Sequence, residues 1–149
     1  TMQKISLKIK KLFPEAKMPV YASEHAAGAD LYALTDHIIR IGPNETAVIH
    51  TGLAAEIPEG YVGLICARSG LATKKGLAPA NKVGVIDSDY RGELRVALHN
   101  HSKYETSIEP YERVAQLLVL PYACAQFEEA EELSDTARGA GGFGSTGTK

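Results

Sequence analysis

Two carboxylates two residues apart are the most chemically suggestive feature of this sequence. They lie in residues 84–92 (GVIDSDYRG), where an apolar run enters a turn. Asp87 or Asp89 is suited to act as a general base toward water, and together they are suited to hold a divalent cation. Aspartates also close Asx-turns on their own backbone, so a turn alone explains the same pair. The pattern indicates either an acid–base site or an ordinary turn.

A second group of polar residues is suited to bind an anion. Arg68, Ser69 and Gly70 follow the apolar run 61–67, where the chain is expected to enter a short helix. Backbone N–H groups at a helix start, a guanidinium fork and a hydroxyl bind phosphate, although a helix cap beside a surface arginine has the same sequence. Gln116 lies in an otherwise apolar run, so its amide is either satisfied in the core or directed into a site.

The C-terminal segment differs from the rest of the chain. Residues 128–149 hold five acids and two bases, and residues 138–147 include five glycines. On composition this is a flexible segment, because ordering so many glycines costs much entropy. Arg138 and Phe143 are unusual in a linker, since a guanidinium pairs with phosphate and a phenyl ring stacks on a base.

Strand periodicity dominates the elements that must position these residues. Residues 4–10 alternate strictly, which places Ile5, Leu7 and Ile9 on one face. Short strands separated by turns favour an all-β sandwich or barrel over βαβ units. One short helix is expected at 71–75, with Ser69 as its cap and Gly76 at its end. The further expected strands are 38–41, 46–51, 61–67, 83–86, 94–99 and 114–120.

Composition sets bounds on function. The 149 residues are 44% hydrophobic with a net charge of −2, which indicates one ordinary globular domain without the basic face expected of a nucleic-acid binder. No apolar run approaches 18 residues, so no membrane partner is expected. Cys66 and Cys124 fit a reduced, cytoplasmic protein, although the sequence also allows one disulfide between them. We expect a body at residues 1–127 followed by the C-terminal arm, residues 128–149.

The order of the motifs resembles that of the trimeric dUTP diphosphatases (dUTPases). The matching segments are 27–31 (AGADL), 68–72 (RSGLA), Asn81 with 84–92, 113–116 (RVAQ) and 138–147 (RGAGGFGSTG). The resemblance implies an all-β, jelly-roll-like subunit in a homotrimer with shared active sites. It also implies Mg²⁺-dependent cleavage of dUTP to dUMP and diphosphate, which keeps uracil out of DNA and supplies dUMP for thymidylate synthesis.

The resemblance also implies a role for each matching residue. Asp87 would activate the attacking water and contact the 3′-hydroxyl, Tyr90 would pack on the deoxyribose, and Asp30 would orient Mg²⁺ through water. The arm would close over an active site. The implied phosphate contacts are Arg68, Ser69, Gly70, Gln116, Arg138, Ser145 and Thr146, and the implied uracil or sugar contacts are Asn81, Gly84, Ile86, Asp87, Tyr90, Phe143 and Gly144.

Three positions depart from the family pattern. Ala67 stands where a proline is common, and Ala80 and Tyr111 stand near common glycines, so the departures concern loop conformation.

Two other functions stay open. A dCTP deaminase relative would need a glutamate beside the pyrimidine C4, which the uracil-reading segment does not offer. A non-catalytic nucleotide-binding or protein-interaction trimer would have no need of Asp87.

Overall fold

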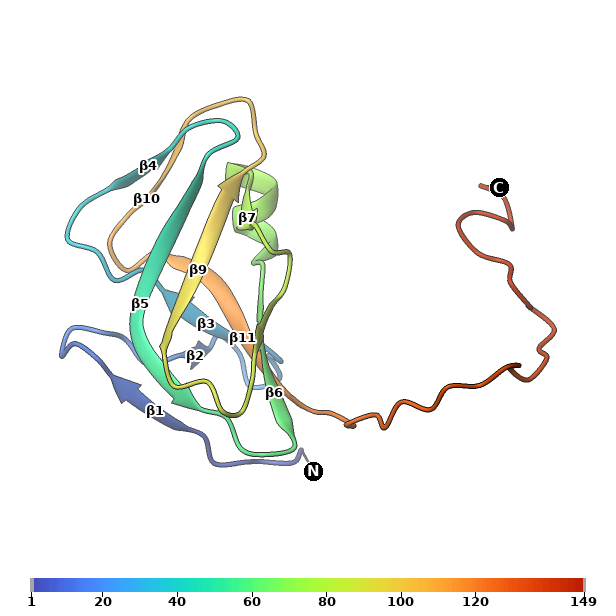
Figure 1. Cartoon of the computed structure of the whole chain (residues 1–149). Helices are drawn as coiled ribbons and strands as arrows, with labels where there is room; N and C mark the ends of the chain where they lie inside the picture. Colours follow the sequence, from blue (N-terminus) through green and yellow to red (C-terminus); the bar gives the residue numbers. More distant parts are fainter. Residues whose placement is uncertain (1, 149) are drawn as a thin grey trace.

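The computed structural model describes residues 2–148 and consists of a β-rich body from which the C-terminal segment extends (Figure 1). Within these residues no helix has the length and apolar composition to cross a bilayer. The elements, in chain order, are β1 (Lys8–Lys11), β2 (Val20–Tyr21), β3 (Ala29–Tyr32), β4 (Ile39–Ile41), β5 (Thr46–Glu56), β6 (Tyr61–Cys66), the helical turn η1 (Leu71–Lys75), β7 (Leu77–Pro79), β8 (Gly84–Ile86), β9 (Glu93–Asn100), β10 (Thr106–Ile108) and β11 (Arg113–Pro121).

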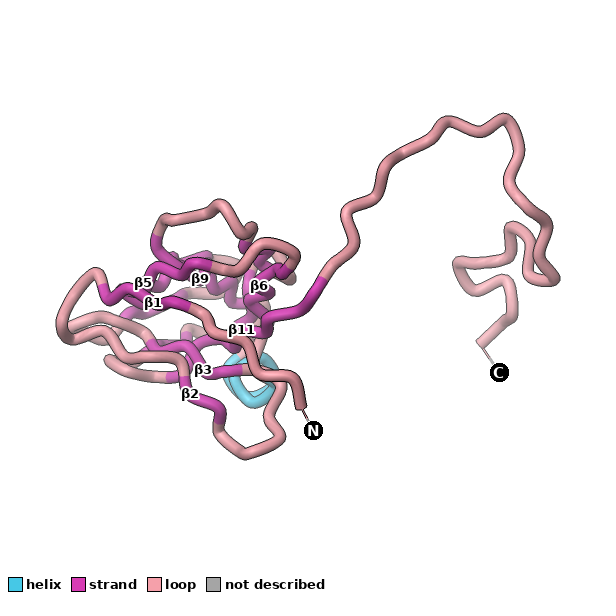
Figure 2. The backbone as a smooth tube through the Cα atoms, turned by 90° about the horizontal axis from the view of Figure 1, so that it is seen from below, coloured by secondary structure: helices cyan, strands magenta, loops and turns pink. Residues whose placement is uncertain are grey.

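Two antiparallel sheets enclose the core. One has the strand order β1-β5-β9-β7, the other has the order β2-β3-β11-β6-β8, and β10 pairs with β4 in a small third sheet. The view from below shows strands of the two larger sheets on either side of the body (Figure 2). Leu53, Leu94 and Leu98 from the first sheet join Leu31, Ile65 and Leu117 from the second in one buried cluster. The all-β, jelly-roll-like prediction is confirmed.

The alternation of polar and apolar residues predicted the bounds of some strands better than those of others. Strand β5 continues to Glu56, beyond the predicted end at 51. The prediction ended too early because residues 51–55 are all buried and therefore show no polar–apolar alternation. At the N-terminus the predicted strand 4–10 is wrong in its bounds, since β1 covers only Lys8–Lys11. Ile5 is exposed there, whereas Leu7 and Ile9 pack against the core.

The helical turn is at the predicted place but is capped differently. Gly76 ends η1 in the left-handed region at φ 68°, as predicted. The predicted side-chain cap by Ser69 is wrong: Ser69 is itself helical, and no side chain caps the turn. Instead, the Ser69 carbonyl accepts a 2.8 Å hydrogen bond from the Thr73 hydroxyl.

Tyr111 has a backbone conformation that glycine adopts more easily than other residues. Its backbone has φ 61°, which a non-glycine residue adopts at a cost. Two contacts offset that cost: the Lys17 ammonium lies 4.5 Å from the centre of the Tyr111 ring, and the Tyr111 hydroxyl donates a 2.9 Å hydrogen bond to the Glu15 carbonyl. Lys17 also lies over the ring of Tyr32. The departure from glycine is therefore locally compensated.

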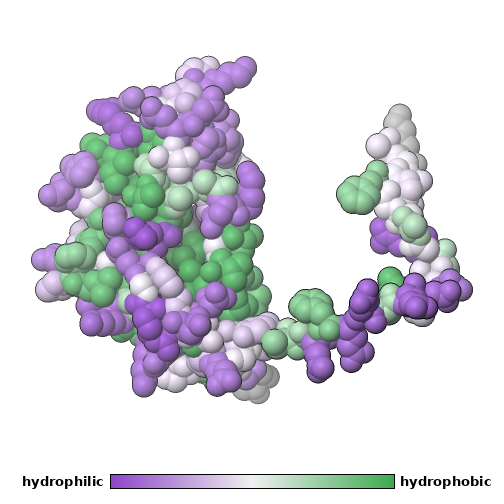
Figure 3. All heavy atoms as spheres, in the orientation of Figure 1, coloured by the Kyte–Doolittle hydropathy of each residue, from purple (hydrophilic) through white to green (hydrophobic). Residues whose placement is uncertain are grey.

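The C-terminal segment leaves the body after β11. In the described chain, its last hydrogen bond to the body is donated by the Tyr122 N–H to the Gly60 carbonyl at 3.1 Å. From there the chain runs away from both sheets (Figures 1 and 2). Its surface alternates hydrophilic and apolar groups and is close to neutral toward its end (Figure 3). Phe127, just before the arm, and Leu133, within it, are 94% and 88% exposed, so residues 122–148 have no core of their own.

Candidate functional site

Asp30 is a buried carboxylate held by two arginines. It lies on β3 and is 6% exposed. One oxygen accepts a 2.9 Å hydrogen bond from Arg68 Nε, and the other accepts a 3.4 Å bond from Arg113 Nη1. Burying a carboxylate is costly unless it is paired, and the two guanidinium groups meet that requirement. Among residues 2–148 the terminal nitrogens of Arg68 make no hydrogen bond, so they are available to an anion.

Gln116 lies beside this ion pair. On β11 it pairs in register with Asp30 of β3 and with Cys66 of β6. Its Nε2 donates a 2.8 Å hydrogen bond to the Ala67 carbonyl, a group that proline would also supply. A Cβ at Gly28 would overlap the Gln116 amide oxygen, so this position needs glycine for close approach. We call Asp30, Arg68, Arg113 and Gln116 the Asp30 cluster; Ser69 and Gly70 follow it as exposed residues.

The segment around β8 forms a separate group. Strand β8 pairs with β6 through Gly84–Ile65 and Ile86–Gly63, and it is the last strand of its sheet. Its unpaired backbone N–H and C=O groups are therefore available to another partner. A cavity of about 330 Å³ opens here, at the small end of ligand pockets. Its lining includes Pro79, Asn81, Gly84, Val85, Ile86 and Arg95.

Asp87 and Tyr90 lie just beyond β8. They line a neighbouring cavity of about 230 Å³ together with Val85, Ile86, Glu93 and Arg95. Asp87 is exposed, and within residues 2–148 neither its carboxylate nor that of Asp89 accepts a hydrogen bond. The Asx-turn interpretation is therefore wrong for this turn, which is closed by the Tyr90 N–H donating to the Asp87 carbonyl at 3.1 Å. The Asp87 carboxylate is left available for chemistry.

The glycine-rich part of the arm forms a third group. Arg138 Nε donates a 2.7 Å hydrogen bond to the Gly141 carbonyl, and the Ser145 N–H donates to the Gly142 carbonyl at 3.0 Å. Phe143 is fully exposed and has φ 51°. Over the described residues of the arm, 128–148, no hydrogen bond reaches the body. Gly144 and Thr146 are exposed in the same turns.

The structure thus divides the predicted site residues into three groups. Within residues 2–148 no hydrogen bond or ion pair joins the Asp30 cluster to Asp87 or Tyr90. None joins the arm to the Asp30 cluster, to Asp87 or to Tyr90. Sequence reasoning did not assign roles to Arg113, Gly28 or Glu93, although all three stand in or beside the motifs. Arg113 opens the 113–116 motif, and a buried acid at Asp30 was a signal that a cation must lie near it.

Known proteins match this chain over nearly its whole length. The family model described as dUTPase matches residues 14–147. A deoxyuridine 5′-triphosphate nucleotidohydrolase of Nautilia profundicola is 53% identical over 96% of this chain and 99% of its own length. The chain belongs to the dUTPase family. It is therefore a nucleotide-hydrolysing enzyme, as the order of its motifs predicted.

Solved dUTPases share the fold. The dUTPase of Staphylococcus bacteriophage 80alpha in a structure with dUPNHPP has a TM-score of 0.88 and 32% identity, covering 97% of this chain and 100% of that one. Another structure of the phage 80alpha dUTPase, described without a nucleotide, has a TM-score of 0.78 and 29% identity, and covers 87% of this chain and 99% of that one. The likeness to the nucleotide-bound structure extends over a larger share of this dUTPase.

Proposed function

We propose that this dUTPase cleaves dUTP to dUMP and diphosphate with Asp87 as general base. A water oxygen bonds to the α-phosphorus as the bond to the diphosphate oxygen breaks, and the water proton passes to the Asp87 carboxylate. The observation that carries this proposal is the exposed Asp87 carboxylate, unpartnered within residues 2–148, beside Tyr90 in a chain of this family. The product dUMP serves thymidylate synthesis, and removal of dUTP keeps uracil out of DNA.

Substrate recognition follows from the three groups. The Arg68 guanidinium, Ser69, Gly70 and the second N–H of the Gln116 amide donate to phosphates. This fits the terminal nitrogens of Arg68, which make no hydrogen bond within residues 2–148. Because β8 is an edge strand, the backbone of Gly84 and Ile86 supplies donors and acceptors to the uracil edge, with the amide of Asn81 beside them. Tyr90 packs on the deoxyribose and leaves no room for a 2′-hydroxyl.

Mg²⁺ fits the residues present if substrate phosphates supply its main ligands. Among residues 2–148 no group of three or more His, Cys, Asp or Glu side chains could hold a metal ion. Mg²⁺ commonly keeps several waters and binds through phosphates and one or two carboxylates, and it would neutralise charge on the triphosphate. Asp30 is the carboxylate in question: each of its oxygens accepts one arginine and retains capacity for a water.

A complete site needs more than one chain. We infer a homotrimer in which the arm, residues 128–149, closes over a site built on the body, residues 1–127. One support is that no hydrogen bond or ion pair joins the three groups among residues 2–148 of one chain. The other is that the likeness to the nucleotide-bound phage enzyme extends over a larger share of this chain. On closure Arg138, Ser145 and Thr146 contact phosphates, while Phe143 and Gly144 cover the uracil and sugar.

The cellular setting follows from the cysteines. Cys66 and Cys124 are both free thiols in the structure. Free thiols are typical of a reducing compartment, and we therefore place the reaction in the cytoplasm.

The deciding experiment is diphosphate release from dUTP, UTP, dCTP and dTTP, each with Mg²⁺ and with excess EDTA. We expect rapid release from dUTP alone, abolished by EDTA and restored by added Mg²⁺. Equal release from UTP would overturn the role of Tyr90. Binding of dUTP without release would indicate a non-catalytic nucleotide binder, and ammonia release from dCTP would indicate a deaminase.

A further inference from the structure

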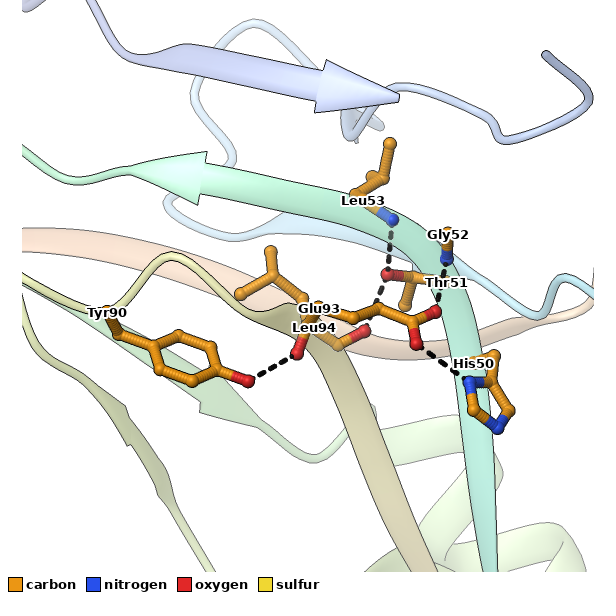
Figure 4. A network of polar contacts seen from close by, with 7 residues as sticks. All are labelled: His50, Thr51, Gly52, Leu53, Tyr90, Glu93 and Leu94. Carbon is orange, nitrogen blue, oxygen red and sulfur yellow. Dashed lines mark hydrogen bonds and ion pairs between the residues drawn. The ribbon is translucent and has the colours of Figure 1, made fainter. Parts of the chain in front are cut away.

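Tyr90 is held by a hydrogen bond to the backbone of Glu93. The Tyr90 hydroxyl donates to the Glu93 carbonyl at 2.8 Å (Figure 4). A Cβ at Gly92 would overlap the Tyr90 hydroxyl, so the ring closes directly over this glycine. The position of the ring therefore depends on where the backbone at Glu93 lies.

The Glu93 side chain is itself anchored at both oxygens. Its Oε1 lies 2.8 Å from His50 Nδ1, and its Oε2 accepts a 3.0 Å hydrogen bond from the Gly52 N–H. The side chain is 16% exposed, and Figure 4 shows it reaching across from β9 to β5. A half-buried carboxylate with two partners holds its backbone in one place more firmly than a free one does.

The anchor exists because β5 is irregular at this point. His50 pairs with Arg95, but the next registered pair is Ala54 with Glu93, so β5 has extra residues opposite β9. Gly52 lies in this bulge with φ 69°, and its N–H bonds to Glu93 instead of joining the ladder. The buried Thr51 hydroxyl donates to the Leu94 carbonyl at 2.6 Å, which fixes the start of β9 as well.

We propose that Glu93 is a positioning residue for sugar discrimination, acting through Tyr90. The bulge of β5 holds the Glu93 carboxylate, the Glu93 carbonyl holds the Tyr90 hydroxyl, and the fixed ring excludes a ribonucleotide. This inference rests on the proposed function, because it takes Tyr90 as the residue that contacts the deoxyribose.

The test is a double-mutant cycle read out as selectivity, the ratio of kcat/KM for dUTP to kcat/KM for UTP. Glu93→Ala should lower this ratio roughly three- to tenfold, the scale of losing one positioning hydrogen bond, and Tyr90→Phe should do the same. The double variant should be no worse than either single variant, since both break one chain of contacts. Glu93→Gln, which can still accept from the Gly52 N–H, should stay within about twofold of the unmodified enzyme.

Controls separate positioning from general damage. Glu105→Ala removes another glutamate that forms an ion pair, from the residue before β10 to Arg40 of β4, and should leave the ratio unchanged. If Glu93→Ala fails to fold, His50→Ala is the second variant, because the His50 side chain is 55% exposed and its removal disturbs the core less. It removes one of the two anchors of Glu93 and should lower the ratio by a smaller factor. An unchanged ratio in both Glu93→Ala and His50→Ala overturns the inference. It is also overturned if the double variant loses selectivity by the product of the two single losses, because the two residues then act independently. If the unmodified enzyme itself does not prefer dUTP, the proposed function fails instead.

Discussion

The Asp30 cluster and the C-terminal arm are built in opposite ways. In the cluster, both oxygens of Asp30 accept arginine hydrogen bonds, and Gln116 donates to a backbone carbonyl. In the described part of the arm the hydrogen bonds stay within the arm, and Phe143 is fully exposed. Folding of one chain thus arranges the cluster in advance, whereas it leaves the described part of the arm without contacts to the body. The β8 segment lies between these extremes, with Tyr90 fixed and Asp87 free.

The strongest expected effect is at Asp87, where a free carboxylate is assigned the chemistry. Asp87→Asn should lower kcat for dUTP by about 10²–10⁴-fold, the usual contribution of a general base. Binding of dUPNHPP should stay within a few-fold, since the amide has nearly the same shape. Stopped-flow diphosphate release and calorimetric binding measure the two quantities.

Asp89→Asn is the matched control for Asp87, because it changes an exposed acid in the same turn. It should leave kcat within about twofold, as expected for a surface substitution. If Asp89→Asn is the slower variant, the base has been assigned to the wrong carboxylate.

At the Asp30 cluster the effect should appear in stability first. Asp30→Ala leaves two arginines without their buried partner and should lower the free energy of unfolding by about 3 kcal/mol, near the low end for broken buried pairs because both arginines reach solvent. Urea denaturation measures this loss. Asp36→Ala, which removes an exposed acid paired with His37, should cost far less. Equal costs would mean that the cluster is not prearranged.

The arm should show the reverse pattern, with activity lost and stability kept. Phe143→Ala should raise KM for dUTP by about tenfold to a hundredfold through the loss of stacking, with no change in the melting temperature. Phe127→Ala removes another exposed aromatic ring, at the residue just before the arm, and serves as the control. A lower melting temperature for Phe143→Ala would show that the arm is already packed before substrate binds.

The smallest expected effect is on stability, at Tyr111, whose backbone lies in the left-handed region. Lys17→Met keeps the aliphatic stem but removes the charge over two aromatic rings, and should cost about 0.5–1 kcal/mol of unfolding free energy. The loss should shrink in a Tyr111→Gly background, where one ring is gone and the backbone is relieved. Thermal denaturation of the four proteins measures the coupling, and additive losses would contradict the compensation.

What sequence could predict depended on the range of the interaction. The short helix and its end at Gly76 follow from local signals, and the motif order identified the family. The partners of Asp30 did not follow, because Arg113 lies 83 positions away and meets it only through the pairing of β3 with β11. The β5 bulge was missed for a similar reason: residues 51–55 are buried throughout, so no periodicity marks the irregularity.

The freedom of the arm also sets how tightly it needs to bind. About twenty residues separate Tyr122 from Phe143, and a flexible chain of that length spans on the order of 25 Å. A tether of this kind holds its end at an effective concentration of about millimolar. In the proposed closure, a weak intrinsic affinity of the arm for the occupied site would then be enough to keep the site covered during catalysis. The same weakness would let the arm leave once the triphosphate is cleaved, so that a covered site would not slow product release.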